Sequence, residues 1–193
     1  SIPSIDEFHF AEKLPPVTIL DAKNPGAEYF NKYVSKELSV EKYVQIFHQL
    51  RGSSQPLYHT MVLDLIEKIA NNIDHYDSEV VKRIGELIGH MIHENLLNEE
   101  QMKRVFETFV QGFRTDSQMT EFAMAALDIC AIKLVKYPEY AFALLKQPLL
   151  RTSKLYARIR KLSSNLSAPI NLSKKTTLTL HPLLMRFDKL PTP

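Results

Sequence analysis

Residues 80–92 read VVKRIGELIGHMI, and this stretch decides the fold class of the chain. Counted from Val80, its apolar residues recur at offsets of four, seven, eight, eleven and twelve, which share one face of an α-helix. Charged residues stand between them. The sequence therefore predicts an amphipathic helix whose apolar face packs against the rest of the protein.

The same period recurs on both sides of this stretch. The helices that we expect span residues 27–34, 40–51, 56–75, 78–92, 98–113, 119–135, 138–146 and 148–162. Ser39 and Ser78 are the expected N-caps of two of them, and Asn98 with Gln101 resembles a capping box. The segment 119–135 is apolar on nearly every side, so it should be buried. Short connections between these helices predict an all-α solenoid of antiparallel helical hairpins.

The two ends of the chain have a different pattern. Four prolines, Pro3, Pro15, Pro16 and Pro25, favour extended backbone over residues 1–26, and the apolar residues among them suggest a strap laid on the domain. Residues 167–193 also lack helical period. We therefore expect an extended arm over 1–26, a helical-repeat domain over 27–166 and a second extended arm over 167–193.

Composition limits the class of protein. A chain of 193 residues with 45% hydrophobic residues can form one domain without covalent help. The net charge of +2 is too small to identify a nucleic-acid binder. Cys130 is the single cysteine, which excludes an internal disulfide and suits a reducing compartment. No apolar run is long enough to span a bilayer. We expect a protein of the cytoplasm, or of the nucleus as well, without a membrane partner.

Few residues suggest chemistry. His90 and His93 stand on adjacent turns beside Glu94, so two imidazoles could face one metal ion. No third ligand follows at a recognisable spacing, and an ordinary polar helix face is the preferred interpretation. Cys130 lies in an apolar helix, where a thiol behaves as a small buried hydrophobe. The sequence thus predicts no catalytic residue, cofactor or metal ion, and a metal hydrolase is the least favoured hypothesis.

A basic segment follows the last predicted hairpin. Between residues 148 and 175 there is no acidic residue, and the basic residues are Arg151, Lys154, Arg158, Arg160, Lys161, Lys174 and Lys175. Three of them, Lys154, Arg158 and Lys161, are spaced to project from one side of a helix. Three interpretations stay open, namely contact with RNA, a basic face that docks a protein, and a solvated surface.

Several short blocks together resemble a known family. They are Glu28–Phe30, Leu38–Glu41, Gly85–Leu97, Phe122–Asp128 and Lys136–Tyr140. In their order and spacing, over residues 28–147, they resemble the MIF4G (middle domain of initiation factor 4G) module of the large scaffold subunit of the CCR-NOT deadenylase complex. The sequence departs from that pattern at residues 72–78 and 114–116.

The resemblance implies a function in scaffolding without catalysis. It implies a stack of helical hairpins that docks a Caf-type deadenylase and a DEAD-box RNA helicase, joins other CCR-NOT subunits through the rest of the scaffold, and supports mRNA deadenylation, decay and translational repression. The alternative is a related MIF4G-type module of translation initiation or RNA processing that binds a helicase or RNA directly. The candidate contacts with partners or RNA are Arg114, Tyr137, Tyr140, Arg151, Lys154, Arg158 and Lys161.

Overall fold

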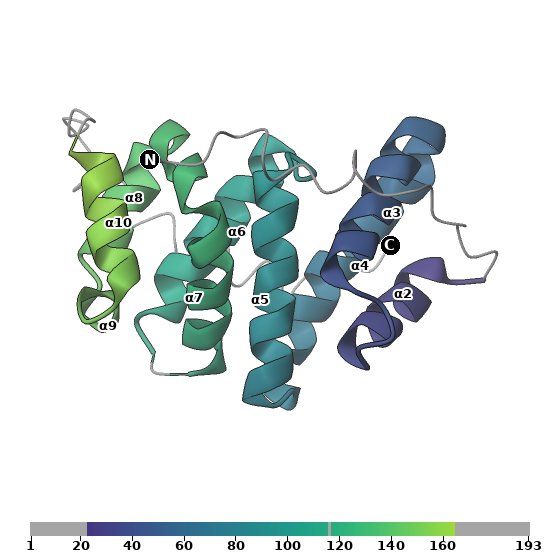
Figure 1. Cartoon of the computed structure of the whole chain (residues 1–193), viewed down its shortest axis with the longest axis horizontal. Helices are drawn as coiled ribbons and strands as arrows, with labels where there is room; N and C mark the ends of the chain where they lie inside the picture. The colour runs from purple at the N-terminus through teal and green to yellow at the C-terminus, as the bar shows by residue number, and fades with distance from the viewer. Residues whose placement is uncertain (1–22, 116, 165–193) are drawn as a thin grey trace, which may run out of the picture.

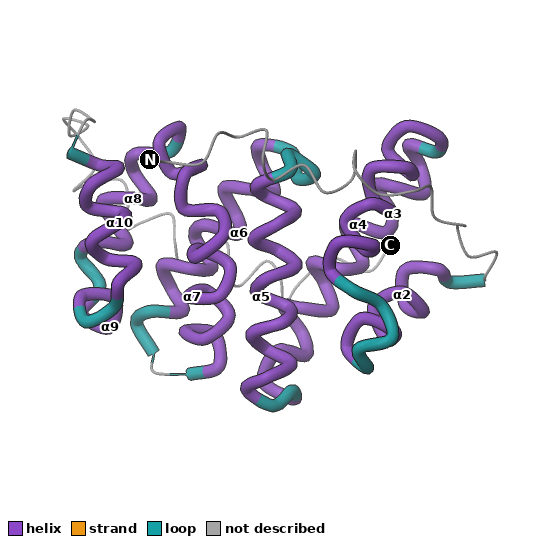
Figure 2. Tube along the Cα trace, in the orientation of Figure 1, coloured by secondary structure: helices purple, strands orange, loops and turns teal. Residues whose placement is uncertain are grey.

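The computed structural model describes residues 23–115 and 117–164, and all regular structure in these ranges is helical, as Figure 2 shows. The α-helices are α2 Pro25–Val34, α3 Val40–Ser53, α4 Gln55–Asn72, α5 Ser78–His93, α6 Glu99–Gly112, α7 Gln118–Cys130, α8 Pro138–Leu145, α9 Pro148–Arg151 and α10 Lys154–Ser163. Two 3₁₀ segments join them, η2 Ile73–His75 and η3 Ala131–Lys136. The predicted all-α class is confirmed.

The helices form a row in which neighbours in sequence are mostly neighbours in space (Figure 1). The helices α2, α3 and α4 stand at one end of the row, and α8, α9 and α10 stand at the other. In the middle, α5 and α7 lie side by side and make the most extensive contact between any two helices described. Such a row, in which each element touches only its neighbours, is a helical solenoid.

Local capping chemistry begins most helices where the sequence predicts. Ser39 Oγ accepts a hydrogen bond from the Lys42 amide at 3.3 Å. Asn98 and Gln101 form the reciprocal capping box, with bonds of 2.8 and 3.0 Å. The expected cap Ser78 is wrong, because the Asp77 carboxylate accepts from the Val80 amide at 2.9 Å instead. A carboxylate at this position also interacts favourably with the positive end of the helix dipole.

Three of the predicted helices are divided in the structure. The segment expected over 56–75 is α-helical only to Asn72 and ends in the 3₁₀ segment η2. The segment expected over 119–135 is α-helical only to Cys130 and then tightens into η3, a form that is frequent at the ends of α-helices. The segment expected over 148–162 is interrupted after Arg151, because Ser153 Oγ accepts from the Tyr156 amide at 3.3 Å and begins α10 anew.

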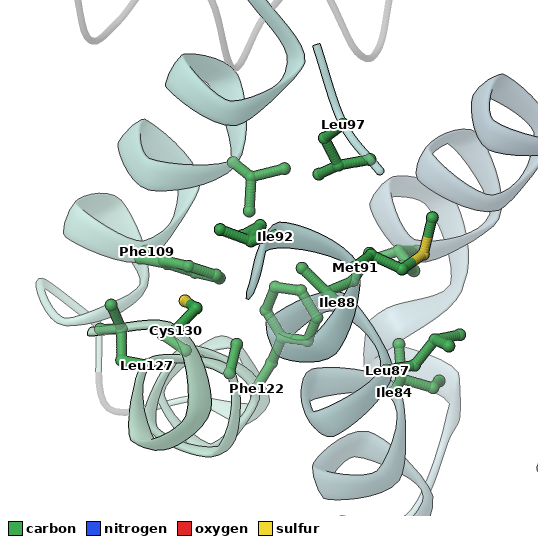
Figure 3. Close-up of a cluster of buried hydrophobic side chains, with 14 of the residues drawn as sticks. Ile84, Leu87, Ile88, Met91, Ile92, Leu97, Phe109, Phe122, Leu127 and Cys130 are labelled. Carbon is green, nitrogen blue, oxygen red and sulfur yellow. The ribbon is translucent and has the colours of Figure 1, made fainter. Parts of the chain in front are cut away.

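The core confirms both apolar patterns. On α5 the stripe residues from Ile84 to Ile92 are at most 1% exposed, whereas Val80 at the start of the stripe is only partly buried. In Figure 3 Ile88 and Ile92 lie toward Phe122 and Phe109, whereas Ile84 and Leu87 lie on the side of α5 away from α7. The α7 residues Phe122, Leu127 and Cys130 and the α6 residue Phe109 are buried to the same degree. The predicted burial is therefore confirmed for one face of α7, whereas Met124 is only partly buried and Val135, at the end of the expected segment, is 39% exposed. The helix α5 lies at the centre of this core.

Two glycines let the backbones of α5 and α7 approach closely. A Cβ atom at Gly85 would lie 2.5 Å from the Phe122 carbonyl oxygen, and one at Gly89 would lie 2.6 Å from the Ala126 carbonyl oxygen. Both distances are shorter than any ordinary contact between carbon and oxygen atoms. The glycines are one helical turn apart on α5, so they form a smooth strip that faces the α7 backbone.

The substitution Gly85→Ala should therefore destabilise the fold by about 1–3 kcal/mol, because the added methyl group forces α5 and α7 apart. The matched control is Gly52→Ala in α3, where an added Cβ would meet no atom within 4 Å. At that site alanine should be neutral or stabilising by up to about 1 kcal/mol. Urea unfolding of both variants measures the two changes, and an equal response of the two proteins would contradict the role given to the α5–α7 contact.

The predicted terminal arms fall largely outside the described residues. This holds for the strap over 1–22, for the arm over 167–193 and for Lys174 and Lys175 within it. The helix α2 begins at Pro25, two residues before the expected start of the helical domain. The two boundaries between the three predicted segments remain predictions.

Candidate functional site

The predicted basic residues share the exposed face of α10 and the end of α9. Leu155 and Ile159 turn toward the core and are at most 4% exposed. The opposite face carries exposed basic residues, and Arg151 is exposed at the end of α9. Lys154, Arg158 and Lys161 share this face of α10, and Arg160 is exposed to one side of it. The structure therefore brings the four predicted contacts of the basic segment together at one end of the solenoid.

One of these cations is tied to the neighbouring helix. Arg158 Nη1 donates to the backbone oxygen of Asp128 at 2.9 Å and to its Oδ1 atom at 3.1 Å. Both side chains are about half exposed or more, so this ion pair contributes at most about 1 kcal/mol to stability. The pair links α10 to the last turn of α7 and partly compensates the charge of Arg158.

Arg114 lies apart from this basic face in the chain. It is exposed directly after α6 and donates from Nη1 to Gln111 Oε1 at 3.2 Å. Its side chain is thus accessible from solvent, but it does not belong to the α9–α10 segment.

Tyr137 and Tyr140 belong to the core. Each is 8% exposed, and their ring centroids lie 5.4 and 5.7 Å from that of Phe106. The Tyr140 hydroxyl donates to Glu107 Oε1 at 3.2 Å, and burial raises the pKa of the Glu107 carboxyl. The structure gives these two tyrosines a packing role between α6 and α8 and leaves them little surface for a partner.

The histidine cluster on α5 is not the ordinary polar face that its sequence pattern favours. His93 and Glu94 are 6% and 2% exposed, and Glu94 Oε2 lies 3.6 Å from His48 Nε2 of α3. The correction follows from the packing of α3 against the C-terminal half of α5, a contact between segments distant in sequence. In residues 23–115 and 117–164, no group of three or more His, Cys, Asp or Glu side chains is arranged to hold a metal ion.

Cys130 behaves as the sequence predicts. Its side chain is fully buried, and burial raises the pKa of its thiol to about 12. The thiol is therefore protonated and out of reach of solvent at neutral pH.

Sequence reasoning missed the exposed apolar side chains. Among the residues that the structure describes, the large apolar side chains that are most exposed are Leu63 at 52%, Val135 at 39% and Leu149 at 38%. Leu63 stands two residues from both Met61 and Leu65 of the buried stripe, hence about 200° from each around α4. That offset is a signal in the sequence that could have identified it. None of the helices described has the length and apolar character needed to cross a bilayer.

Comparison with known proteins identifies the family. The model of the CCR4-NOT transcription complex subunit 1 TTP binding domain matches residues 10–169. The chain belongs to this family. Among solved structures, the N-terminal domain of the yeast Not1 is similar, with a TM-score of 0.67 and 22% sequence identity. That alignment covers 83% of the present chain and 32% of the yeast chain, so the chain spans about a third of its length. A search of curated protein sequences gave no match.

The predicted resemblance to the scaffold subunit of the CCR4-NOT complex is thus confirmed, and the alternative of a translation-initiation module is not supported. The MIF4G module in particular is not confirmed, because the family that matches is the TTP binding domain. The structure explains the difference. The blocks Gly85–Leu97 and Phe122–Asp128, which carry much of the resemblance, lie mainly in α5 and α7 and pack on one another. The sequences of these two blocks therefore reflect how the helices pack and do not describe the surface that contacts a partner.

The partly buried His90 makes stability depend on pH. Burial lowers the pKa of His90, Glu41 opposes this shift, His93 adds to it and Glu94 opposes it. The unfolded chain therefore takes up a proton near pH 6.5 that the folded chain does not yet bind. The stability that depends on neutral His90 is fully present above that pH. It is lost as the pH falls toward the pKa of His90 in the folded chain.

The substitution His90→Gln should accordingly flatten the decrease in the free energy of unfolding between about pH 7.5 and pH 5.5. Chemical unfolding at several pH values measures this slope. The control is His59→Gln at an exposed position of α4, which should leave the slope unchanged. A His90→Gln protein with the slope of the unaltered chain would show that another group controls the acid response.

Proposed function

We propose that this chain is a non-catalytic scaffold domain of a CCR4-NOT complex and that its principal partner is TTP, the partner named for its family. The observation that carries the proposal is the family match over residues 10–169, which includes every helix described. The architecture supports it, because a helical solenoid offers long exposed faces and few places where reactive groups converge. The fold therefore favours binding over catalysis.

The exposed face of α4 is the best candidate for the TTP contact. Protein interfaces depend on a few apolar or aromatic anchors that become buried on binding. Leu63 is the most exposed large apolar side chain described, and Ile66, one turn further along α4, is only partly buried. Together they give this face an apolar surface that a partner can cover. The exposed face of α10, in contrast, is strongly charged.

The substitution Leu63→Asp should weaken TTP binding by at least about tenfold, since it places a charge in the contact. Its effect on the free energy of unfolding should stay within about 0.5 kcal/mol, because the side chain is exposed. The matched control is Leu149→Asp, the other strongly exposed leucine, at the far end of the row. Titration calorimetry with TTP and urea unfolding measure both quantities. A loss of binding in the Leu149 variant alone would move the contact to the α9 end.

A second candidate function is docking of a Caf-type deadenylase and a DEAD-box RNA helicase, as the resemblance in the sequence implies. Holding a deadenylase on the same scaffold as an RNA-bound partner raises its effective concentration at the messenger RNA. The proposal includes a role in mRNA deadenylation, decay and translational repression, and a location in the cytoplasm or nucleus. Other CCR4-NOT subunits would be reached through the rest of the scaffold.

Co-purification separates these candidates. The chain is mixed in turn with TTP, with a Caf-type deadenylase and with a DEAD-box helicase at micromolar concentration, and complexes are resolved by size-exclusion chromatography. We expect a stable complex with TTP. A complex with the deadenylase or the helicase and none with TTP would reverse the order of the two candidates, and the absence of all three complexes would refute both.

A further inference from the structure

The charges of the chain are separated along the sequence. Residues 129–164 contain eight basic residues and a single acidic one, Glu139. Residues 1–128 contain twelve basic and twenty acidic residues. The small net charge of +2 therefore conceals an acidic N-terminal part and a basic C-terminal end. Segregated charge of this kind informs about partners in a way that the net charge does not.

The basic end presents a helix face that no other described helix covers. Figure 1 shows α10 at the edge of the row, and no other described helix lies beyond it in this view. Three cations, Lys154, Arg158 and Lys161, follow one another on its exposed face, and Arg151 precedes them on α9. In the described part of the chain, neither Lys154 nor Lys161 has an ion-pair partner. Their charges are available to a ligand.

We propose that this face, formed by Arg151, Lys154, Arg158 and Lys161, binds the phosphate backbone of single-stranded RNA. The inference goes beyond the binding of TTP and does not depend on it. Cations alone suffice for phosphate contacts, and electrostatic attraction supplies most of the affinity of such binding.

The composition of α10 favours RNA over an acidic protein segment. A protein interface needs apolar anchors at its centre, whereas the large apolar side chains of α10 are buried or partly buried against the core. The three cations of α10 span about 10 Å along the helix axis. Tyr156 packs partly against the core, so it offers little surface for stacking on a base. Binding should therefore be independent of sequence.

Arg158 can join this face while it keeps its contact with α7. Both of its bonds to Asp128 use the Nη1 atom, and a guanidinium carries five donor hydrogens. Donors on the other nitrogens remain for a phosphate. The carboxylate of Asp128 nevertheless reduces the local positive potential, so Asp128 acts against binding. A substitution that removes the charge of Asp128 should therefore bind RNA more tightly.

Fluorescence anisotropy with a labelled single-stranded RNA of about 12 nucleotides tests the proposal across a range of salt concentrations. When the logarithm of the binding constant is plotted against the logarithm of the salt concentration, four phosphate contacts predict a slope of about −2.8. The double variant Lys154→Glu/Lys161→Glu should bind at least about tenfold more weakly at low salt, with a slope reduced to about −1.4 or less in magnitude. Asp128→Asn should bind roughly twofold more tightly or better, because it removes one negative charge beside Arg158.

The matched control is Lys42→Glu/Lys82→Glu, which makes the same change in net charge at exposed sites of α3 and α5. It should bind RNA within about twofold of the unaltered chain. Equal losses in the two double variants would overturn the proposal, since they would show a response to net charge alone. Tighter binding of a polyglutamate peptide of equal charge would also overturn it and identify an acidic protein segment as the occupant. All variants change exposed side chains, and their helical circular dichroism should match that of the unaltered chain.

Discussion

The contact between the backbones of α5 and α7 is the constraint on which the row of helices depends. Gly85 and Gly89 leave room for carbonyl groups of α7 that any larger residue would displace. On its other side α5 contacts α2 and α3, and α7 in turn contacts α6, η3 and α10. Both halves of the solenoid are therefore joined through one close helix pair. A change in its spacing would alter the relative position of the α4 face and the basic face at the far end.

Polar contacts between segments distant in sequence fix how the helices are aligned around this pair. Arg83 donates to the Tyr33 carbonyl at 2.9 Å and lies over its ring, which ties α5 to α2. After α5 the backbone of Asn95 adopts the left-handed conformation, with φ of 57°. Its carbonyl accepts from Arg51 at 2.8 Å and its side chain accepts from Lys133 at 2.9 Å. Apolar packing is tolerant of small shifts, whereas hydrogen bonds depend on direction. These contacts thus tie α5 and the loop after it to α2, α3 and η3.

The sequence could predict what depends on short-range periodicity and could not predict what depends on pairs of distant residues. The stripe that follows Val80 and the box of Asn98 and Gln101 act within one or two helical turns, so their outcome is local. The burial of Glu94 depends on His48 of another helix, and no local pattern reports such a contact. For the candidate site, the exposed face of α10 follows from its periodicity, whereas the packing role of Tyr140 depends on α6. The family blocks were informative about the scaffold subunit, but because they are core segments they did not distinguish between two of its helical domains.

The position of Cys130 gives the molecule a natural reporter of its own motion. The sequence has one cysteine, and its thiol is fully enclosed where α7 meets the core. A thiol reagent can reach it only when α7 separates from its neighbours, so in the limit of fast closing the modification rate reports the equilibrium of that opening. Ligands that fasten the helices together would slow the reaction without touching the sulfur atom. The reactivity of this one sulfur atom thus measures the local opening of α7, with no label introduced.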